Sequence, residues 1–384
     1  MTAQRGGSLE RRVFRPEEVA PLVPAWEALA QRAAQSPFET PAWLLPWLRH
    51  YGGRWQAQVL TWWRDSELVG VAPVAWRSQT VRRITVRDLA FWGATGTPLA
   101  GWVDLLADDA VANDVAADFS SWLRDAAPDW DVFHYLHQQA HSPTLASLLR
   151  RPRPWAQVDL ARVLHSVEFV VRLADDTAGW GGYLGPKARR EIRREIRVFE
   201  RGGGRIEQVV DPGQAGAVVD ALRELMTARW GAREAYFRRD RAFAGFAVDV
   251  VESALKTGTG WVLVARQEDT IVACLVLLAV QRKAAAVLIG VTTDPAFASL
   301  SLGKCLFHRA MDEAVARGCR TFSFLAEDRG YKTTFWRAER WPTESGILTR
   351  GLVGRAVGAY VTARRVLPRR VRGALAGRSA GHRS

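Results

Sequence analysis

The sequence predicts an α/β (α+β) protein of two domains, each with a mixed central sheet flanked by helices. Its 384 residues are too many for one ordinary hydrophobic core and suit two domains of typical size. Apolar residues make up 48% of the chain, which favours a folded globular protein over a disordered one. Strand-like alternation and helix-like periodicity also follow one another along the chain, as expected for layered sheets and helices.

The N-terminal half is predicted to start, after a flexible lead over residues 1–11, with one strand and two helices. Proline opens both helices, and proline is favoured in a first helical turn. Strand patterns then alternate with helical ones. The predicted strands are 12–14, 56–63, 68–76, 84–92 and 132–136, and the predicted helices are 16–34, 41–51, 110–125 and 144–150.

The C-terminal half ends in the best-defined unit of the sequence, a strand, loop, helix and strand between Val287 and Trp336. A strand, three helices and a three-strand meander come before this unit in the chain, and the last strand of the meander is the first strand of the unit. The predicted strands are 167–173, 261–266, 271–280, 284–291 and 320–325, and the predicted helices are 187–201, 212–229, 241–256 and one from Leu302 to Gly318.

The loop of this unit is the strongest candidate for a ligand site. Its small residues Ser299, Ser301 and Gly303 let backbone N–H groups approach an anion, and Lys304 adds a positive charge. The first turn of the following helix, with its free amides and positive dipole end, favours a phosphate. The alternative is a short connection in a core unit that binds nothing.

Residues 301–306, Ser-Leu-Gly-Lys-Cys-Leu, resemble the pyrophosphate loop of the GNAT superfamily of acyltransferases. The last strand, followed by Tyr331, Lys332 and Trp336, resembles the signature of its CelD/BcsL-like branch, related to the FemAB-type transferases. Weaker similarities lie at Ser36–Trp43, Leu68–Pro73 and Lys187–Arg194. The resemblance implies two GNAT-like domains in tandem: residues 12–160 without a cofactor loop and residues 161–345 with one.

The resemblance further implies transfer of an acyl group from acetyl-CoA or another acyl-CoA to an amine or hydroxyl of an unknown acceptor, in envelope or polysaccharide metabolism, without a metal ion. A backbone N–H would stabilise the carbonyl oxyanion. Tyr331 would protonate the thiolate, and Glu327 or Asp328 would take the proton of the nucleophile. The implied catalytic residues are Glu327, Asp328, Tyr331 and Lys332, and the implied cofactor-binding residues are Ile289, Gly290, Val291, Ser299, Ser301, Leu302, Gly303 and Lys304.

Two other functions remain open. The superfamily loop usually has Gly at Ser301, and the branch usually has Asp at Ser323 and Glu at Arg329. The last departure keeps open a non-catalytic descendant that binds a polysaccharide or a membrane-associated partner. A FemAB-like transferase that uses aminoacyl-tRNA would explain the basic helix 187–201. The alternative for that helix is a solvated face on which Glu191 and Glu195 pair with arginines.

Basic residues gather at the C-terminus. From Thr349 onward the chain has nine arginines and no acidic residue, and these supply most of the formal net charge of +13. Apolar residues recur at helical spacing between Leu352 and Val361, so residues 346–384 are predicted to form a basic amphipathic helix or a disordered tail. Such a segment fits an anionic membrane surface or RNA.

The remaining signals concern metals and location. The three cysteines have no paired spacing, which favours a reducing compartment. His134, His137 and His141 share no face of one strand or helix, so we expect them to close a strand and not to bind a metal.

Asp104, beside an apolar strand, is a further candidate for a site residue in a cleft between the halves. With no apolar leader and no long apolar run, we expect a cytoplasmic protein, peripheral to the inner face of the membrane if its tail binds lipid.

Overall fold

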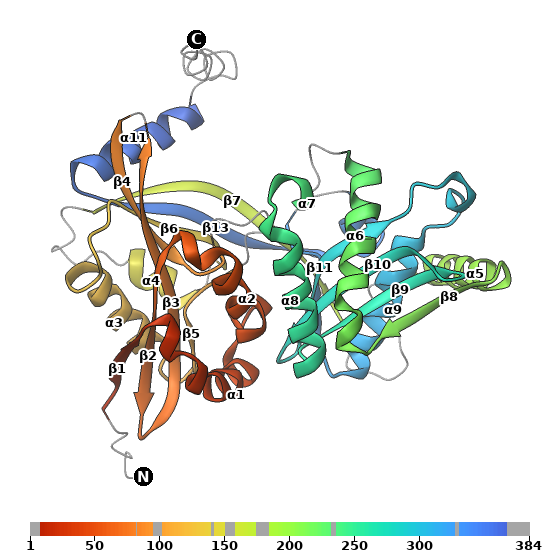
Figure 1. Cartoon of the computed structure of the whole chain (residues 1–384), viewed down its shortest axis with the longest axis horizontal. Helices are drawn as coiled ribbons and strands as arrows, with labels where there is room; N and C mark the ends of the chain where they lie inside the picture. The colour runs from red at the N-terminus through yellow and green to blue at the C-terminus, as the bar shows by residue number, and fades with distance from the viewer. Residues whose placement is uncertain are drawn as a thin grey trace.

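The computed structural model describes residues 8–81, 83–94, 102–139, 142–149, 158–173, 184–231, 236–326 and 330–366. In these residues the strands form one mixed sheet of thirteen strands, with helices packed on it (Figure 1). The predicted α/β class is therefore confirmed, and the sheets of the two halves are continuous with each other.

The order of strands across the sheet is β1-β2-β3-β4-β6-β13-β7-β12-β11-β10-β9-β8, and β5 pairs with β3 outside this path. The β4–β6 and β11–β12 pairs are parallel, and the other pairs are antiparallel. The strands are β1 Glu10–Phe14, β2 Gln56–Arg64, β3 Glu67–Val81, β4 Ile84–Phe91, β5 Leu106–Ala107, β6 Val132–Gln139, β7 Val158–Arg172, β8 Gly204–Val209, β9 Gly260–Gln267, β10 Thr270–Val280, β11 Lys283–Val291, β12 Thr321–Ser323 and β13 Glu339–Arg350.

Helices fill the connections between these strands. The α-helices are α1 Val23–Ala33, α2 Pro41–Tyr51, α3 Ala112–Asp125, α4 Pro143–Leu149, α5 Pro186–Arg201, α6 Ala215–Trp230, α7 Tyr236–Arg239, α8 Ala242–Thr257, α9 Leu302–Ala316, α10 Tyr331–Thr334 and α11 Gly351–Val366. The 3₁₀ turns are η1 Pro16–Glu18, η2 Ala20–Leu22, η3 Pro37–Glu39, η4 Gly52–Arg54, η6 Pro212–Gln214 and η7 Pro295–Phe297.

Most predicted elements are present, and the differences have physical causes. The helix predicted over 16–34 is two 3₁₀ turns followed by α1, because Pro21 and Pro24 lack the N–H groups that a continuous helix needs. The strand predicted over 320–325 is only β12, since Leu325 has a positive φ of 58° and the chain turns there. Strands β8 and β13 were not predicted.

Strands β7 and β13 join the two halves of the molecule. They pair with each other along most of their length, and β13 also pairs with β6. Figure 1 shows both strands extending between the N-terminal half on the left and the C-terminal half on the right, in opposite directions. The predicted boundaries at 160/161 and 345/346 each fall inside one of these two strands. The halves thus share one backbone hydrogen-bond network, and the domain boundaries stay a prediction.

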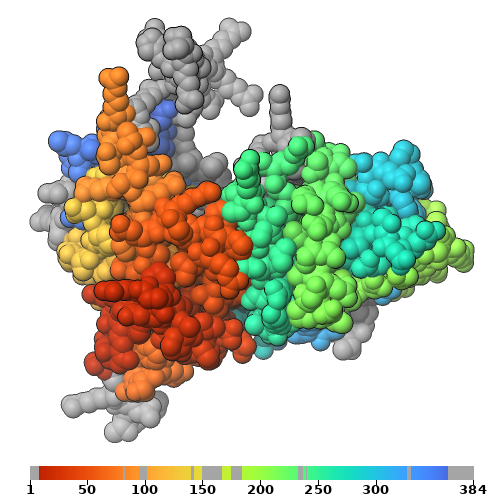
Figure 2. All heavy atoms as spheres, in the orientation of Figure 1, coloured from red at the N-terminus to blue at the C-terminus, as the bar shows by residue number. Residues whose placement is uncertain are grey.

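The halves also meet through helices α2 and α8. The ring of Phe246 lies 4.9 Å from that of Trp43 and 5.6 Å from that of Tyr51, between ring centres. Beside these rings, the carboxylate of Asp249 contacts Arg49 Nη1 at 2.5 Å and His50 Nε2 at 2.8 Å. Figure 2 shows the two halves abutting along this contact.

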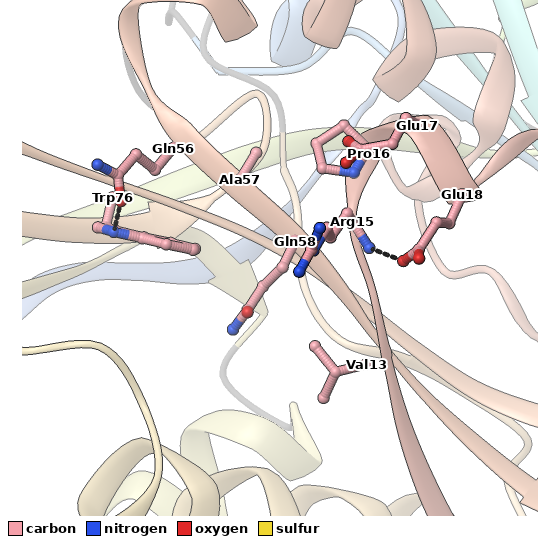
Figure 3. Close-up of a pocket in the computed structure, with 9 residues that line it drawn as sticks. All are labelled: Val13, Arg15, Pro16, Glu17, Glu18, Gln56, Ala57, Gln58 and Trp76. Atoms are coloured by element: carbon pink, nitrogen blue, oxygen red, sulfur yellow. Dashed lines mark hydrogen bonds between the residues drawn. The ribbon is translucent and has the colours of Figure 1, made fainter.

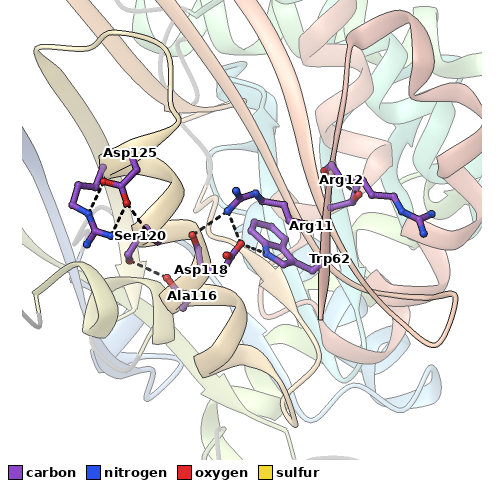
Figure 4. Close-up of polar contacts among 10 residues, drawn as sticks. Arg11, Arg12, Trp62, Ala116, Asp118, Ser120 and Asp125 are labelled. Carbon is purple, nitrogen blue, oxygen red and sulfur yellow. Dashed lines mark hydrogen bonds and ion pairs between the residues drawn. The ribbon is translucent and has the colours of Figure 1, made fainter. Parts of the chain in front are cut away.

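A carboxylate joins the edge strand β1 to helix α3. Asp118 Oδ2 accepts hydrogen bonds from Arg11 Nη1 and from Trp62 Nε1, each at 2.7 Å (Figure 4). Because the arginine is charged and partly shielded, this contact is stronger than an exposed surface ion pair. It ties β1, β2 and α3 together at the edge of the sheet.

Helix α11 covers the sheet with one apolar face. Val353, Val357 and Val361 pack against Val86, Val132 and Ile347. Leu352 and Tyr360, predicted for the same apolar stripe, are instead 84% and 45% exposed. Residues 346–350 of the predicted tail belong to β13, and residues 367–384 lie outside the described residues. Contact of this segment with an anionic membrane or RNA stays a prediction. None of the described helices combines the length and apolar character needed to cross a bilayer.

Candidate functional site

Strand β11 continues beyond its parallel neighbour β12. The two strands pair only between Lys283–Ala285 and Thr321–Ser323. From Ala286 to Val291, β11 keeps β10 on one side, and in the described part of the chain no strand pairs with its other side. Alternate backbone N–H and C=O groups of this stretch, which we call the open edge of β11, therefore face outward from the ladder.

A lysine side chain stabilises the turn that ends β12. Lys332 is 5% exposed, and its Nζ donates to the carbonyl oxygens of Phe324 at 2.9 Å and Ala326 at 2.6 Å. Leu325 between them adopts the left-handed backbone noted above and donates its N–H to Ser323 Oγ at 3.0 Å. In this geometry Lys332, predicted as catalytic, holds the turn that follows β12, just after β12 stops pairing with β11.

The first turn of α9 lies over the far end of the open edge. A Cβ on Gly303 would lie 3.4 Å from Val291 Cγ2 and 3.8 Å from Ile289 Cδ1, so these three predicted residues do come together. Gly290 faces the other side of the sheet, where its Cβ would meet Leu225 at 2.9 Å. The N–H groups of Leu302 and Gly303 begin the helix and have no acceptor within it.

The other loop residues differ in exposure. Ser299 is exposed and Ser301 is half-buried, whereas the side chain of Leu302 is buried in the core, so that Leu302 offers only its backbone. Lys304 holds its Nζ 4.4 Å from the ring centre of Phe335 at the end of α10. The loop thus offers two helix-start N–H groups and one nearby cation to a ligand.

A buried carboxylate already contacts this loop. Glu195 Oε2 of α5 accepts the backbone N–H of Ser301 at 2.9 Å and lies 4.0 Å from Cys305 Sγ. The prediction that Glu195 pairs with arginines on a solvated face is wrong, because the residue is only 5% exposed. It lies on the face of α5 that also carries the buried Ile192 and Ile196, and its charge suits the N-terminus of α9.

Tyr331 lies beside α9. Its half-buried ring is 6.5 Å from that of Phe307 in α9 and 6.3 Å from that of Phe324 after β12. The predicted acids Glu327 and Asp328 lie outside the described residues. The structure therefore places Tyr331 beside α9, the helix whose first turn contacts the end of β11, and the roles of these residues stay predictions.

The histidines of the His134–His141 segment have other neighbours. His134 Nε2 lies 3.1 Å from Asp88 Oδ1, and the ring of His137 lies 5.2 Å from that of Trp102. His141 lies outside the described residues. No group of three side chains that could hold a metal ion occurs within the described ranges.

An open hollow of about 640 Å³ lies in the N-terminal half, at the other end of the strand order (Figure 3). Trp76 Nε1 donates to Gln56 Oε1 within it at 2.7 Å, and the N–H of Arg15 donates to Glu18 at 2.7 Å. The lining residues are Val13, Arg15, Pro16, Glu17, Glu18, Gln56, Ala57, Gln58 and Trp76. The predicted site residues are not among them.

Residues 186–333 match the acetyltransferase (GNAT) domain family. This range begins with α5, ends within α10 and contains all the predicted catalytic and cofactor-binding residues. The similarity supports a transferase, while the CelD/BcsL-like branch stays a prediction. No curated protein matches the chain in sequence.

Several solved structures are similar to most of the chain. FemX superposes with a TM-score of 0.58 at 11% identity, over 88% of this chain and 96% of FemX. The C-terminal domain (DUF2156) of a putative lysylphosphatidylglycerol synthetase from Agrobacterium fabrum gives 0.52 at 15% identity, over 90% and 96%. A conserved protein of unknown function from Bacteroides thetaiotaomicron VPI-5482 gives 0.52 at 10% identity, over 86% and 97%. At these identities the likeness shows a shared fold.

Proposed function

We propose that the chain is a transferase that moves an acyl group from an acyl-CoA thioester to an amine or hydroxyl of its acceptor. The observation that carries this proposal is the open edge of β11, which leads from the β12 turn to the start of α9. Both elements lie in the segment that matches the GNAT acetyltransferase domain.

The chain's backbone would hold the donor. Alternate N–H and C=O groups of Ala286–Val291 can pair with the amides of an extended pantetheine arm, as a sheet edge pairs with an added strand. At about 3.3 Å per residue, these six residues form an edge of roughly 20 Å. The N–H groups of Leu302 and Gly303 and the ammonium of Lys304 would receive the pyrophosphate.

The same elements can assist the chemical step. When bound, the thioester supplies an activated carbonyl carbon. A backbone N–H of the open edge, at the end away from the pyrophosphate, would donate to its oxygen and stabilise the negative charge that develops there. The hydroxyl of Tyr331 would protonate the departing thiolate. Glu327 or Asp328 stays a candidate for taking a proton from the nucleophile.

The buried Glu195 favours a second candidate function. Its carboxylate occupies the N–H of Ser301, which was predicted to bind pyrophosphate, and a second anion beside it is repelled. The exposed side of α5 carries Lys187, Arg190, Arg193, Arg194 and Arg197. A transferase that takes its acyl group from aminoacyl-tRNA would use this basic surface and would not need a full pyrophosphate loop.

Calorimetric titration with acetyl-CoA and with a longer acyl-CoA tests the proposal. The parent protein is compared with Gly303→Glu and with its uncharged control Gly303→Gln, since a Cβ fits at this position in ordinary contact. We expect the parent to bind, and the Glu variant to lose at least tenfold more affinity than the Gln variant, because only Glu adds charge beside the pyrophosphate. Equal losses would contradict pyrophosphate binding at this loop.

The same titration separates the alternatives. A parent protein that binds no acyl-CoA but binds tRNA, with an affinity that falls steeply with salt, would favour the aminoacyl-tRNA function. A parent that binds neither donor would leave the non-catalytic alternative.

A further inference from the structure

Helix α11 is apolar on two opposite sides. Its inner side packs on the sheet through Val353, Val357 and Val361. The side that points away from the sheet, which we call the outer face of α11, consists of exposed residues that recur every three or four positions and so share one face of the helix. The members of the outer face are Leu352, Arg355, Ala356, Ala359 and Tyr360. Arg355 is the one member that carries a charge.

The outer face is unusual for a helix on the surface of a protein. Such a helix normally carries charged and polar residues on its solvent side. Leu352 is 84% exposed and Tyr360 is 45% exposed, and the small Ala356 and Ala359 between them are exposed as well. Exposed apolar residues are ordinary when they are scattered singly, whereas several on one element mark a contact surface.

The charge around the outer face has one sign. All charged residues of α11 are arginines, and from Thr349 to the C-terminus the chain has nine arginines and no acidic residue. Arg355 lies at one edge of the outer face, because each residue turns an α-helix by about 100°. Arg350 directly precedes the helix, with its guanidinium 5.9 Å from the ring centre of Trp130. The partner of this surface therefore combines an apolar layer with negative charge.

The size of the outer face argues against a protein partner. Helix α11 has 16 residues. At 1.5 Å per residue and a diameter of about 10 Å, the outer face covers roughly 240 Å². A stable protein–protein contact buries about 800 Å² of each partner. A second copy of the chain would also bring two arginine-rich segments together, and like charges repel.

An anionic bilayer matches both properties of the outer face. A helix that lies in the plane of a membrane surface needs only a narrow apolar strip, which enters the boundary between headgroups and acyl chains. Tyrosine is favoured at this boundary because its ring is apolar and its hydroxyl is polar. Arginines beside the strip attract anionic headgroups. RNA would also attract the arginines, but its phosphates give no reason for an exposed leucine.

We propose that the outer face of α11 docks the protein on the surface of an anionic lipid bilayer. Leu352 enters the acyl boundary, Tyr360 lies at the level of the headgroups, and Arg355 contacts their phosphates. This docking goes beyond the proposed function and does not depend on it, because α11 lies outside residues 186–333. Figure 1 shows α11 beside β4 at the left of the molecule and α5 at the right, so the docking surface and the candidate donor site occupy different parts of the protein.

Flotation of the full-length protein with lipid vesicles tests this docking. The vesicles contain phosphatidylcholine alone, or phosphatidylcholine with phosphatidylglycerol in a ratio of seven to three. The proteins are the parent, Leu352→Ser, Arg355→Gln and the control Val210→Ser, which removes a 72% exposed valine that follows β8. Because Leu352 makes little contact with the rest of the protein, its replacement leaves the fold intact.

We expect the parent and the control to bind the anionic vesicles at least tenfold more tightly than the neutral ones. Leu352→Ser should weaken binding to the anionic vesicles by at least fivefold, because an apolar side chain no longer enters the bilayer. Arg355→Gln should weaken the same binding by about fivefold. Equal binding of the parent and Leu352→Ser would overturn the proposal, since the arginines alone would then account for the attraction.

A fluorescent label gives the second readout. The variants are Ala359→Cys, on the outer face, and Val210→Cys as the control, each labelled with the environment-sensitive dye NBD. The dye attaches at the new position, because Cys274, Cys305 and Cys319 are buried. We expect the NBD emission to shift to shorter wavelength on anionic vesicles when the label is at position 359, and to stay unchanged when it is at position 210.

The other partners are separate outcomes of the same work. A label at position 359 whose emission does not shift on anionic vesicles would overturn the proposal. Binding to polyuridylate RNA without binding to either vesicle would overturn it in favour of RNA. A dimer that Leu352→Ser dissociates, measured by sedimentation without vesicle binding, would overturn it in favour of a second copy of the chain.

Discussion

Replacing Glu195 by Gln should strengthen the binding of acyl-CoA. The amide oxygen of Gln can still accept the N–H of Ser301, which Glu195 accepts at 2.9 Å, so the loop keeps its hydrogen bond and loses one negative charge. A phosphate on the N–H groups of Leu302 and Gly303 would lie beside that charge. With an effective dielectric constant of about 20, two unit charges about 6 Å apart repel each other by about 3 kcal/mol.

Solvent at the half-buried loop screens part of this repulsion, so we expect affinity for acetyl-CoA to rise by about tenfold. The control is Glu191→Gln, an exposed glutamate on the same helix, which should change affinity less than twofold. In the absence of ligand, Glu195→Gln should lower the free energy of unfolding by up to about 1 kcal/mol, because α9 loses a favourable charge at its N-terminus. Calorimetry at low and at moderate salt measures the first effect, and chemical denaturation the second. The reasoning is refuted if Glu195→Gln binds acetyl-CoA more weakly than the parent, or no better than Glu191→Gln does.

Three further predictions concern stability. Lys332→Met should lower the free energy of unfolding by about 2–4 kcal/mol, since two backbone carbonyls lose their donor; a urea midpoint equal to that of the parent would contradict this. Gly354→Ala should displace α11 or lower the free energy of unfolding by about 1–3 kcal/mol, because the added Cβ would clash with the carbonyl oxygen of Asp131. An unchanged thermal unfolding temperature would argue against this packing. Folding raises the pKa of Glu39, so the protonated carboxyl stabilises the folded state at low pH, and this stabilisation is lost as pH rises above the unfolded pKa of 4.5. Glu39→Gln has no such proton to lose. Its free energy of unfolding should therefore fall less than that of the parent between pH 5 and pH 8. Parallel stability profiles for these two proteins would show that Glu39 does not titrate in this way.

The sequence was sufficient for elements with strong local patterns. The meander that became β9, β10 and β11 has continuous apolar runs, and α9 has both a periodic face and the stop at Gly318, so their positions needed no long-range information. The contact of Gly303 with the end of β11 also follows from a strand, loop and helix that are adjacent in the chain. Local order therefore predicted that this loop lies against the end of the strand before it, while the roles of its residues stay predictions.

The missed elements depend on contacts between distant parts of the chain. Strand β13 contains Pro342 and Gly346, which weaken the strand signal, and it is stabilised by pairing on both sides with β6 and β7. Glu195 lies in a helix dominated by arginines, so only its place between the buried Ile192 and Ile196 could have indicated that it faces the core. The sequence also cannot reveal that Glu168 meets Lys283, because 115 residues separate two side chains that a sheet brings to 2.7 Å.

Backbone hydrogen exchange with and without acetyl-CoA tests the proposed donor site, because it reports on the amides that would bind the donor. We expect slower exchange in two segments together, Ala286–Val291 and Ser299–Gly303, and no change in the hollow around Trp76. Saturating acetyl-CoA that leaves both segments unprotected, or that protects amides only elsewhere, would contradict the placement of the donor at the open edge of β11.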